Sequence, residues 1–209
     1  MQRLIAHWCR GAAVIVAAVL AAAPMAHAQE GAEALVKRVS EDVIATIKTD
    51  PLVQAGNQVR VREVMEIKLA PNFDFSRMTA LAMGRHWRAA TPEQQQRLTD
   101  EFRTLLVRTY SGALAKYRDE VIEYKPLRAN PGDTDVIVRT AVLKPGGAPI
   151  QIDYSMAKTA SGWKAYDVIV GGVSLVTNYR DEFGEQIRSG GVDGLVKTLA
   201  EKNKGAPAK

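Results

Sequence analysis

SGWKAYDVIVGGVSLVTNYRDEF, residues 161–183, contains the change of pattern that decides the fold. A Ser-Gly turn signal opens the stretch, and residues 163–170 then alternate imperfectly between two faces, as a strand does. Gly171-Gly172 ends this run, and apolar residues recur three or four positions apart beyond it, at Val173, Val176, Tyr179, Phe183 and Ile187. We therefore predict a strand that reverses on two glycines into an amphipathic helix, which places the helix against the end of a sheet.

Upstream of this stretch the chain shows the same period of two in three further segments. Turn signals separate them: Asn-Pro-Gly at 130–132, Pro-Gly-Gly at 145–147 and Ser-Gly at 161–162. Because such short connections join antiparallel neighbours, we predict an α+β fold with a four-stranded antiparallel sheet. The predicted strands cover residues 121–127, 135–143, 150–158 and 163–170.

Two of these strands carry unusual apolar faces. Ile150, Ile152, Tyr154 and Met156 form one clean apolar face. The strand from Val136 to Leu143 is apolar on both faces except at two positions, which suits either a central strand covered on both sides or a strand that faces a cavity.

Helical spacing dominates the chain before the sheet. The clearest helix start is Thr91-Pro92-Glu93-Gln94, in which Thr91 and Gln94 make a capping box and Pro92 takes the first helical position. That helix should reach about Arg118 and span roughly 40 Å, at about 1.5 Å per residue. Other predicted helices cover residues 31–49, residues 58–69, a segment capped by Asp74 or Ser76 that ends near Met83, and a short segment from Val192.

The first 28 residues match a secretory signal peptide. Arg3 and Arg10 make a basic region, residues 12–23 are apolar but too short to span a membrane, and Ala26-His27-Ala28 is a cleavage signal. We predict a signal peptide at 1–28, a single domain at 29–203 and a disordered tail at 204–209. Cleavage lowers the net charge from +5 to +3, because the leader carries two arginines and no acidic residue.

The mature chain is poor in catalytic side chains. The only cysteine of the full sequence, Cys9, and two of its three histidines lie in the leader. The mature chain therefore has no thiolate, and His86 is its one histidine. No spacing marks an acid and base pair, so we predict no enzyme activity and no metal. Lysines and arginines alternate with acidic residues along the chain, which argues against nucleic acid as a partner.

Several segments resemble the MlaC family, also called the toluene-tolerance family, of periplasmic phospholipid-binding proteins. WKAYDVIVGGVSLVTNYRDEF (163–183) is similar to the family's signature region. The family pattern also appears in FDFSRMTALAMGRHWRAATPEQQQRLTDEF (73–102), LLVRTYSGALAKY (105–117) and PIQIDYSMAK (149–158). The resemblance extends from about Ala34 to Asn203.

The resemblance implies a curled sheet similar to nuclear-transport-factor-like folds, wrapped by about six helices and shaped as a cone with a mouth at one end. It implies a soluble carrier in the periplasm that takes phospholipid between an outer-membrane lipoprotein complex and an inner-membrane ABC-transporter complex and so maintains outer-membrane lipid asymmetry. Phospholipid would be cargo, with no cofactor and no chemistry on the lipid.

With the resemblance, we predict that the lipid tails lie between the sheet and the long helix. The predicted lining is Phe102, Leu106, Tyr110, Val138, Ile150, Ile152, Tyr154, Met156, Val168, Val170, Val173 and Val176, with Val173 deep inside. Two alternatives stay open from the residues alone. The same side chains could fill a solid core, as in a protein-interaction module of the cell envelope, or Asp153 or Asp167 could serve as a general base inside the cone.

Overall fold

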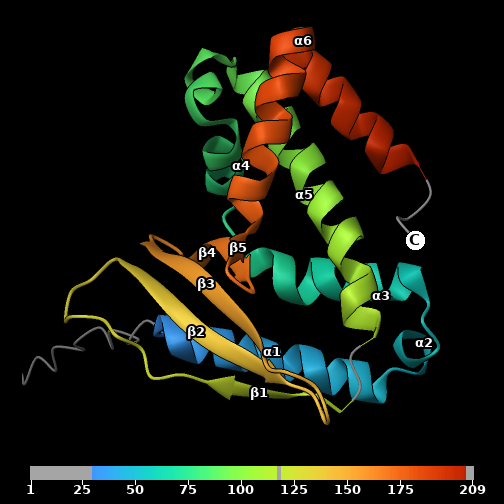
Figure 1. Cartoon of the computed structure of the whole chain (residues 1–209), viewed down its shortest axis with the longest axis vertical. Helices are drawn as coiled ribbons and strands as arrows, with labels where there is room; N and C mark the ends of the chain where they lie inside the picture. Colours follow the sequence, from blue (N-terminus) through green and yellow to red (C-terminus); the bar gives the residue numbers. More distant parts are fainter. Residues whose placement is uncertain (1–29, 117–118, 206–209) are drawn as a thin grey trace, which may run out of the picture.

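The computed structural model describes residues 30–116 and 119–205, so the predicted signal peptide and residues 206–209 of the predicted tail lie outside the described residues. The fold is α+β, as predicted, with one antiparallel sheet and helices before and after it (Figure 1). The helices are α1 (Ala32–Thr49), α2 (Pro51–Gln54), α3 (Gln58–Val64), the π-helix η1 (Met65–Leu69), the 3-10 helix η2 (Ala70–Asn72), α4 (Phe75–Met83), the 3-10 helix η3 (Gly84–Ala89), α5 (Pro92–Ala115) and α6 (Leu175–Lys204).

The sheet has five strands, so the prediction of four was wrong. They are β1 (Val121–Tyr124), β2 (Asp135–Leu143), β3 (Ile150–Thr159), β4 (Gly162–Val170) and β5 (Val173–Ser174), in the order β1-β2-β3-β4-β5 with every neighbouring pair antiparallel. The extra strand arises because Gly171 and Gly172 take φ values of 56° and 85°, which reverse the chain tightly enough for Val173 to pair with Val170. The likeness to nuclear-transport-factor-like folds stays a prediction.

Local signals set the helix boundaries. The capping box at Thr91 and Gln94 is present and starts α5, which ends at Ala115, before the predicted Arg118. Ser174 caps α6 by accepting a hydrogen bond from the Thr177 backbone N–H. The backbone leaves helical geometry at Gly191 (φ 67°, ψ −172°), so the last part of α6 is a second helix from Val192, as predicted. It runs to Lys204, within the predicted tail.

Three hydrophobic clusters hold the elements together. The first joins α4, α5 and α6 and contains Phe102 and Phe183, whose rings meet edge to face at 5.0 Å. The second packs α1 against β2, β3 and β4 (Figure 1). The third joins the end of α1 to α2, α3 and the end of α5. No single cluster fills the space where the sheet, α4 and α5 approach one another.

Candidate functional site

A cavity of about 760 Å³ lies between the sheet and the helices. Its walls come from η1, η2, α4, α5, the start of α6 and all the strands from β2 to β5, and most of its lining is aliphatic or aromatic. The lining residues are Met65, Leu69, Ala70, Phe73, Phe75, Met78, Leu106, Val107, Tyr110, Ala113, Leu114, Lys116, Glu120, Val142, Lys144, Ile150, Ile152, Tyr154, Val168, Val170, Val173, Leu175 and Asn178.

Strand register explains the apolar wall on the sheet side. Val142 pairs with Ile150, Tyr154 with Val168, and Ile152 with Val170, so these side chains project from one face of three neighbouring strands. The period of two thus collects β-branched residues from separate segments into one continuous wall.

Only half of this sheet face borders the cavity. Val136, Val138 and Met156 belong to the same face but pack under α1, with exposures of 7%, 0% and 1%. Tyr154 lies at the division, because it lines the cavity and also packs against the α1 cluster. One face therefore contains both a solid region and a hollow one.

Exposure separates the floor of the cavity from its mouth. Met78 and Leu106 line it at 1% and 6% exposure, whereas Ile150 and Val173 line it at 48% and 58%. The mouth therefore lies at the end of the sheet where β3 begins and β5 pairs with β4. The expectation that Val173 is deep was wrong: the two-residue strand β5 holds it at the rim.

The structure brings together eight of the twelve predicted lining residues. Leu106, Tyr110, Ile150, Ile152, Tyr154, Val168, Val170 and Val173 all line the cavity. The other four do not: Phe102 and Val176 are buried between the helices, and Val138 and Met156 lie beneath α1. For Val138 and Met156, the period of two predicted the correct face of the sheet, but α1 fills the space in front of them.

Sequence reasoning missed the wall opposite the sheet. Phe73 and Phe75 line the cavity and stack with ring centroids 5.8 Å apart, and Met65 and Leu69 of the π-helix lie beside them in the lining. The two phenylalanines on either side of Asp74 were the available signal in the sequence. Asp74, one of the two predicted caps, begins α4 by accepting a hydrogen bond from the Arg77 backbone N–H.

Two tyrosines, Tyr110 and Tyr154, are among the residues that line this apolar space. Burial raises the pKa of Tyr154 to about 12, while the Thr140 hydroxyl, which hydrogen-bonds to the phenol, opposes the rise. Burial also raises the pKa of Tyr110 above its ordinary value. Both phenols are therefore neutral at physiological pH, and neither adds charge to the cavity.

Neither aspartate considered as a general base lines the cavity. Asp167 accepts hydrogen bonds from the Ser174 hydroxyl at 2.6 Å and from the backbone N–H groups of Val168 and Val176, so it organises the turn between β4 and α6. Asp153 lies on the opposite face of the sheet, with a carboxylate oxygen 4.0 Å from Arg139. Both carboxylates thus have structural partners away from the apolar space.

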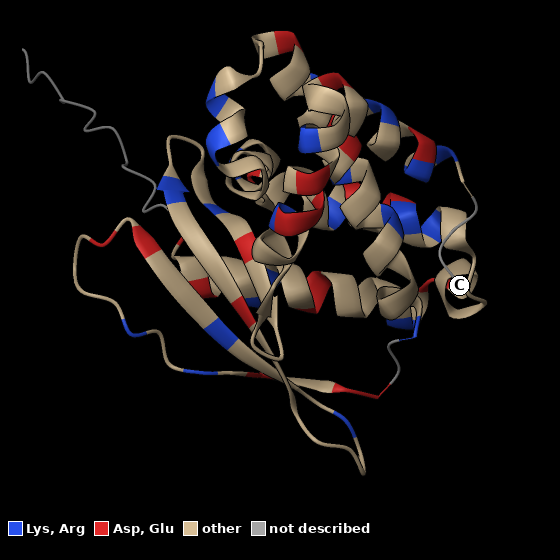
Figure 2. Ribbon diagram, turned by 45° about the horizontal axis from the view of Figure 1, so that its top comes forward, with Lys and Arg blue, Asp and Glu red and all other residues tan. Residues whose placement is uncertain are grey.

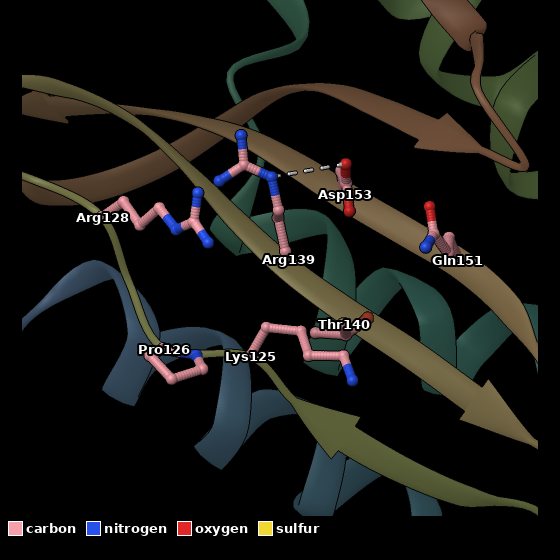
Figure 3. A pocket seen from close by; sticks show the side chains of 7 residues that line it. All are labelled: Lys125, Pro126, Arg128, Arg139, Thr140, Gln151 and Asp153. Atoms are coloured by element: carbon pink, nitrogen blue, oxygen red, sulfur yellow. Dashed lines mark ion pairs between the residues drawn. The ribbon is translucent and has the colours of Figure 1, made fainter.

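The opposite face of the same strands carries a second hollow of about 500 Å³ with a different chemistry (Figure 3). Arg139, Gln151 and Asp153 project from β2 and β3, and the segment after β1 adds Lys125 and Arg128 (Figure 3). Thr140 and Pro126 complete its lining. Charged and amide groups dominate here, so this hollow is unsuited to acyl chains.

Charges of both signs are interspersed over the helices and strands, without a single-sign block (Figure 2). Among the described residues, no group of three or more histidines, cysteines or acidic residues is placed to hold a metal ion. The helices at 30–116 and 119–205 include none with the length and apolar character needed to cross a membrane.

Comparison with known proteins gives a consistent set of relatives. The family model described as "MlaC protein" matches residues 37–201. The toluene tolerance protein ttg2D of Pseudomonas putida is 27% identical over 166 residues, which is 79% of this chain and 76% of the relative. The intermembrane phospholipid transport system binding protein MlaC of Haemophilus influenzae is 22% identical over 144 residues, 68% of this chain and 67% of the relative.

A solved structure matches across most of the fold. It is the phospholipid-binding protein from Ralstonia solanacearum in complex with a phospholipid, with a TM-score of 0.78 and 46% sequence identity. The match covers 83% of this chain and 97% of the other.

Proposed function

Because the chain belongs to the MlaC family, we propose that it is a phospholipid carrier that holds acyl chains in the cavity between the sheet and α5. The observation that carries the proposal is this largely apolar cavity of about 760 Å³ in a fold shared with a phospholipid-bound relative. The volume lies within the range of ordinary small-molecule sites, roughly 300–1,000 Å³.

The energetic requirement for a lipid carrier matches the character of the lining. Two acyl chains contain on the order of 30 methylenes, and hiding each from water is worth about 0.8 kcal/mol, or roughly 24 kcal/mol in total. A carrier must supply an equally apolar environment when lipid leaves a membrane. Val142, Ile152, Val168 and Phe73 supply such surface from both walls of the cavity.

We further propose that the mature protein works in the periplasm and takes phospholipid between an outer-membrane lipoprotein complex and an inner-membrane ABC-transporter complex, which maintains outer-membrane lipid asymmetry. The signal-peptide pattern at residues 1–28 supports export, and the name of the Haemophilus influenzae relative supports a role in phospholipid transport between membranes. The carrier role involves no reaction on the lipid.

A vesicle transfer experiment tests the proposed function. Donor vesicles contain a fluorescent phospholipid with a membrane-bound quencher, and acceptor vesicles contain neither. The purified mature protein should accelerate the appearance of fluorescence in proportion to its concentration, because each molecule removes lipid into its cavity. A rate that does not depend on the protein would contradict carriage and would favour the protein-interaction module.

A further inference from the structure

The cavity mouth carries charge that its floor lacks. The lining includes three charged residues, Lys116, Glu120 and Lys144, and one amide, Asn178. Lys116 is the C-cap residue of α5, and Lys144 directly follows β2. Both lysines are exposed, whereas floor residues such as Met78 are buried.

The sheet register places this charge at the mouth. Val121, the first residue of β1, pairs with Leu143, the last residue of β2, so Glu120 and Lys144 each lie one position beyond the same end of this antiparallel ladder. Val142 pairs with Ile150, whose 48% exposure marks the rim. Lys144 and Glu120 therefore lie at the open end of the sheet wall, and Lys116 lies at the adjoining end of the helix wall.

A lysine at an apolar rim has two useful parts. Its methylene stem covers apolar surface while its ammonium group stays in water. An amphiphile whose tails enter this cavity presents its first polar groups at the same rim, and in a phospholipid the phosphodiester, which carries one negative charge, is among them. The two ammonium groups supply positive charge at the rim, which complements the negative charge of a phosphodiester.

We propose that Lys116 and Lys144 form a phosphate-recognition rim, so that this cavity selects phosphate-bearing lipids over tail-matched neutral lipids such as diacylglycerol. The inference rests on the proposed function and deepens it by naming the headgroup feature and the residues that read it. Apolar lining explains why tails bind, but it does not distinguish a phospholipid from a diacylglycerol, whereas the rim does.

The test replaces both lysines by methionine, which keeps an apolar stem and removes the charge. Lipid-free wild type and the K116M/K144M variant are each incubated with neutral-detergent micelles that contain equal amounts of phosphatidylethanolamine and diacylglycerol with identical tails. Native mass spectrometry then counts the bound molecules of each lipid. We expect wild type to favour the phospholipid, and the variant to lose about threefold to tenfold of that preference, in keeping with two exposed charge contacts.

Two control variants separate the effect of charge from the effect of position. K116R/K144R keeps the charges and should retain the preference. K158M/K197M removes two lysines away from the mouth, Lys158 at the other end of β3 and Lys197 on the last part of α6, and should behave as wild type. Raising the salt from about 0.05 to 0.5 M should weaken the wild-type preference, because exposed charges are screened.

The outcomes separate the two proposals. If wild type takes up neither lipid, carriage itself fails. If wild type binds both lipids equally, or if K116M/K144M keeps the full preference, carriage stands and the phosphate-recognition rim is wrong. Equal losses in K116M/K144M and K158M/K197M would also overturn the rim, because they would show a dependence on total charge alone.

Discussion

Two halves of one sheet face differ in what lies in front of them. Val136, Val138 and Met156 contact α1 and are buried, while Val142, Ile152 and Val168 project from the same face into a cavity. Their residue types are alike, so hydrophobicity does not decide which half is hollow. The difference arises from α1, which covers one half of the face and leaves the other to a cavity between the strands and α5. An apolar strand face thus predicts that the face is covered. The arrangement of the helices decides whether protein side chains or a ligand covers it.

The largest expected effect comes from shortening one side chain in each half of the sheet face. Met156→Ala removes a side chain that is 1% exposed and should lower the free energy of unfolding by about 2–5 kcal/mol, because it leaves a void in packed surroundings. Ile152→Ala on the same strand should cost less than about 1.5 kcal/mol in the lipid-free protein, because its side chain already borders empty space. Urea unfolding of delipidated protein measures both, and equal losses would mean that the two halves are packed alike.

Tyr154, which lies between the two halves of the sheet face, should make the free energy of unfolding depend on pH. The pKa of Tyr154 is about 12 in the folded protein, above the ordinary value of 10 expected for the unfolded chain. Since the raised pKa favours the neutral phenol, its contribution is fully present below about pH 10 and is lost as the pH rises toward 12. The slope is about 1.4 kcal/mol per pH unit in that window.

Tyr154→Phe removes this contribution. Among the described residues, four other tyrosines also have raised pKa values, so the informative quantity is the difference between wild type and the variant. Unfolding free energies at pH 9, 10 and 11 should converge as the pH rises, because only wild type loses the Tyr154 contribution. Parallel curves would show that Tyr154 is not held in a desolvated site.

Filling the hollow half should separate lipid binding from stability. Ile152→Trp places a larger side chain in the cavity and should reduce the phospholipid bound per protein about tenfold, with little loss of folding stability because the space is already open. Gln151→Trp is the matched control, since Gln151 is exposed and projects from the opposite face of the same strand. Phosphate analysis of extracted lipid reports occupancy, and a similar loss in both variants would contradict the assignment of faces.

The smallest expected effect belongs to the opposite face. Asp153→Asn removes a 4.0 Å ion pair with Arg139, whose side chain is 45% exposed, and should change the free energy of unfolding by less than about 0.5 kcal/mol. Lipid transfer should continue at the wild-type rate. A large loss of transfer would revive a functional role for this carboxylate.

The sequence predicted what depends on local signals. The capping box at Thr91, the bounds of β2 and the division of β3 into two faces all follow from neighbouring residues, and all agree with the structure. Strand β5 escaped prediction because Val173 also fits the helical spacing of the residues after it. Its pairing with Val170 depends on the turn at the two glycines, which pattern analysis had assigned only to the reversal of the chain.

The cavity itself could be predicted only in part, for a physical reason. Alternation identifies Val138 and Ile152 as members of one face, but their difference depends on α1, which lies about a hundred residues earlier in the chain. Likewise, the distance between β3 and α5 depends on how three hydrophobic clusters pack, and no single segment records it. The phenylalanine wall was missed for the same reason, because Phe73 forms a backbone bridge with Ala165 of β4, a strand far away in the sequence.

Native mass spectrometry of the mature protein, purified from a bacterial envelope without added lipid, examines the main claim most directly. If the open half of the sheet face encloses acyl chains, the spectrum should show the protein mass increased by that of a phospholipid, and Ile152→Trp should shift the population to the bare chain. A wild-type spectrum with only the bare mass, from a protein that also takes up no phospholipid from vesicles, would contradict the account.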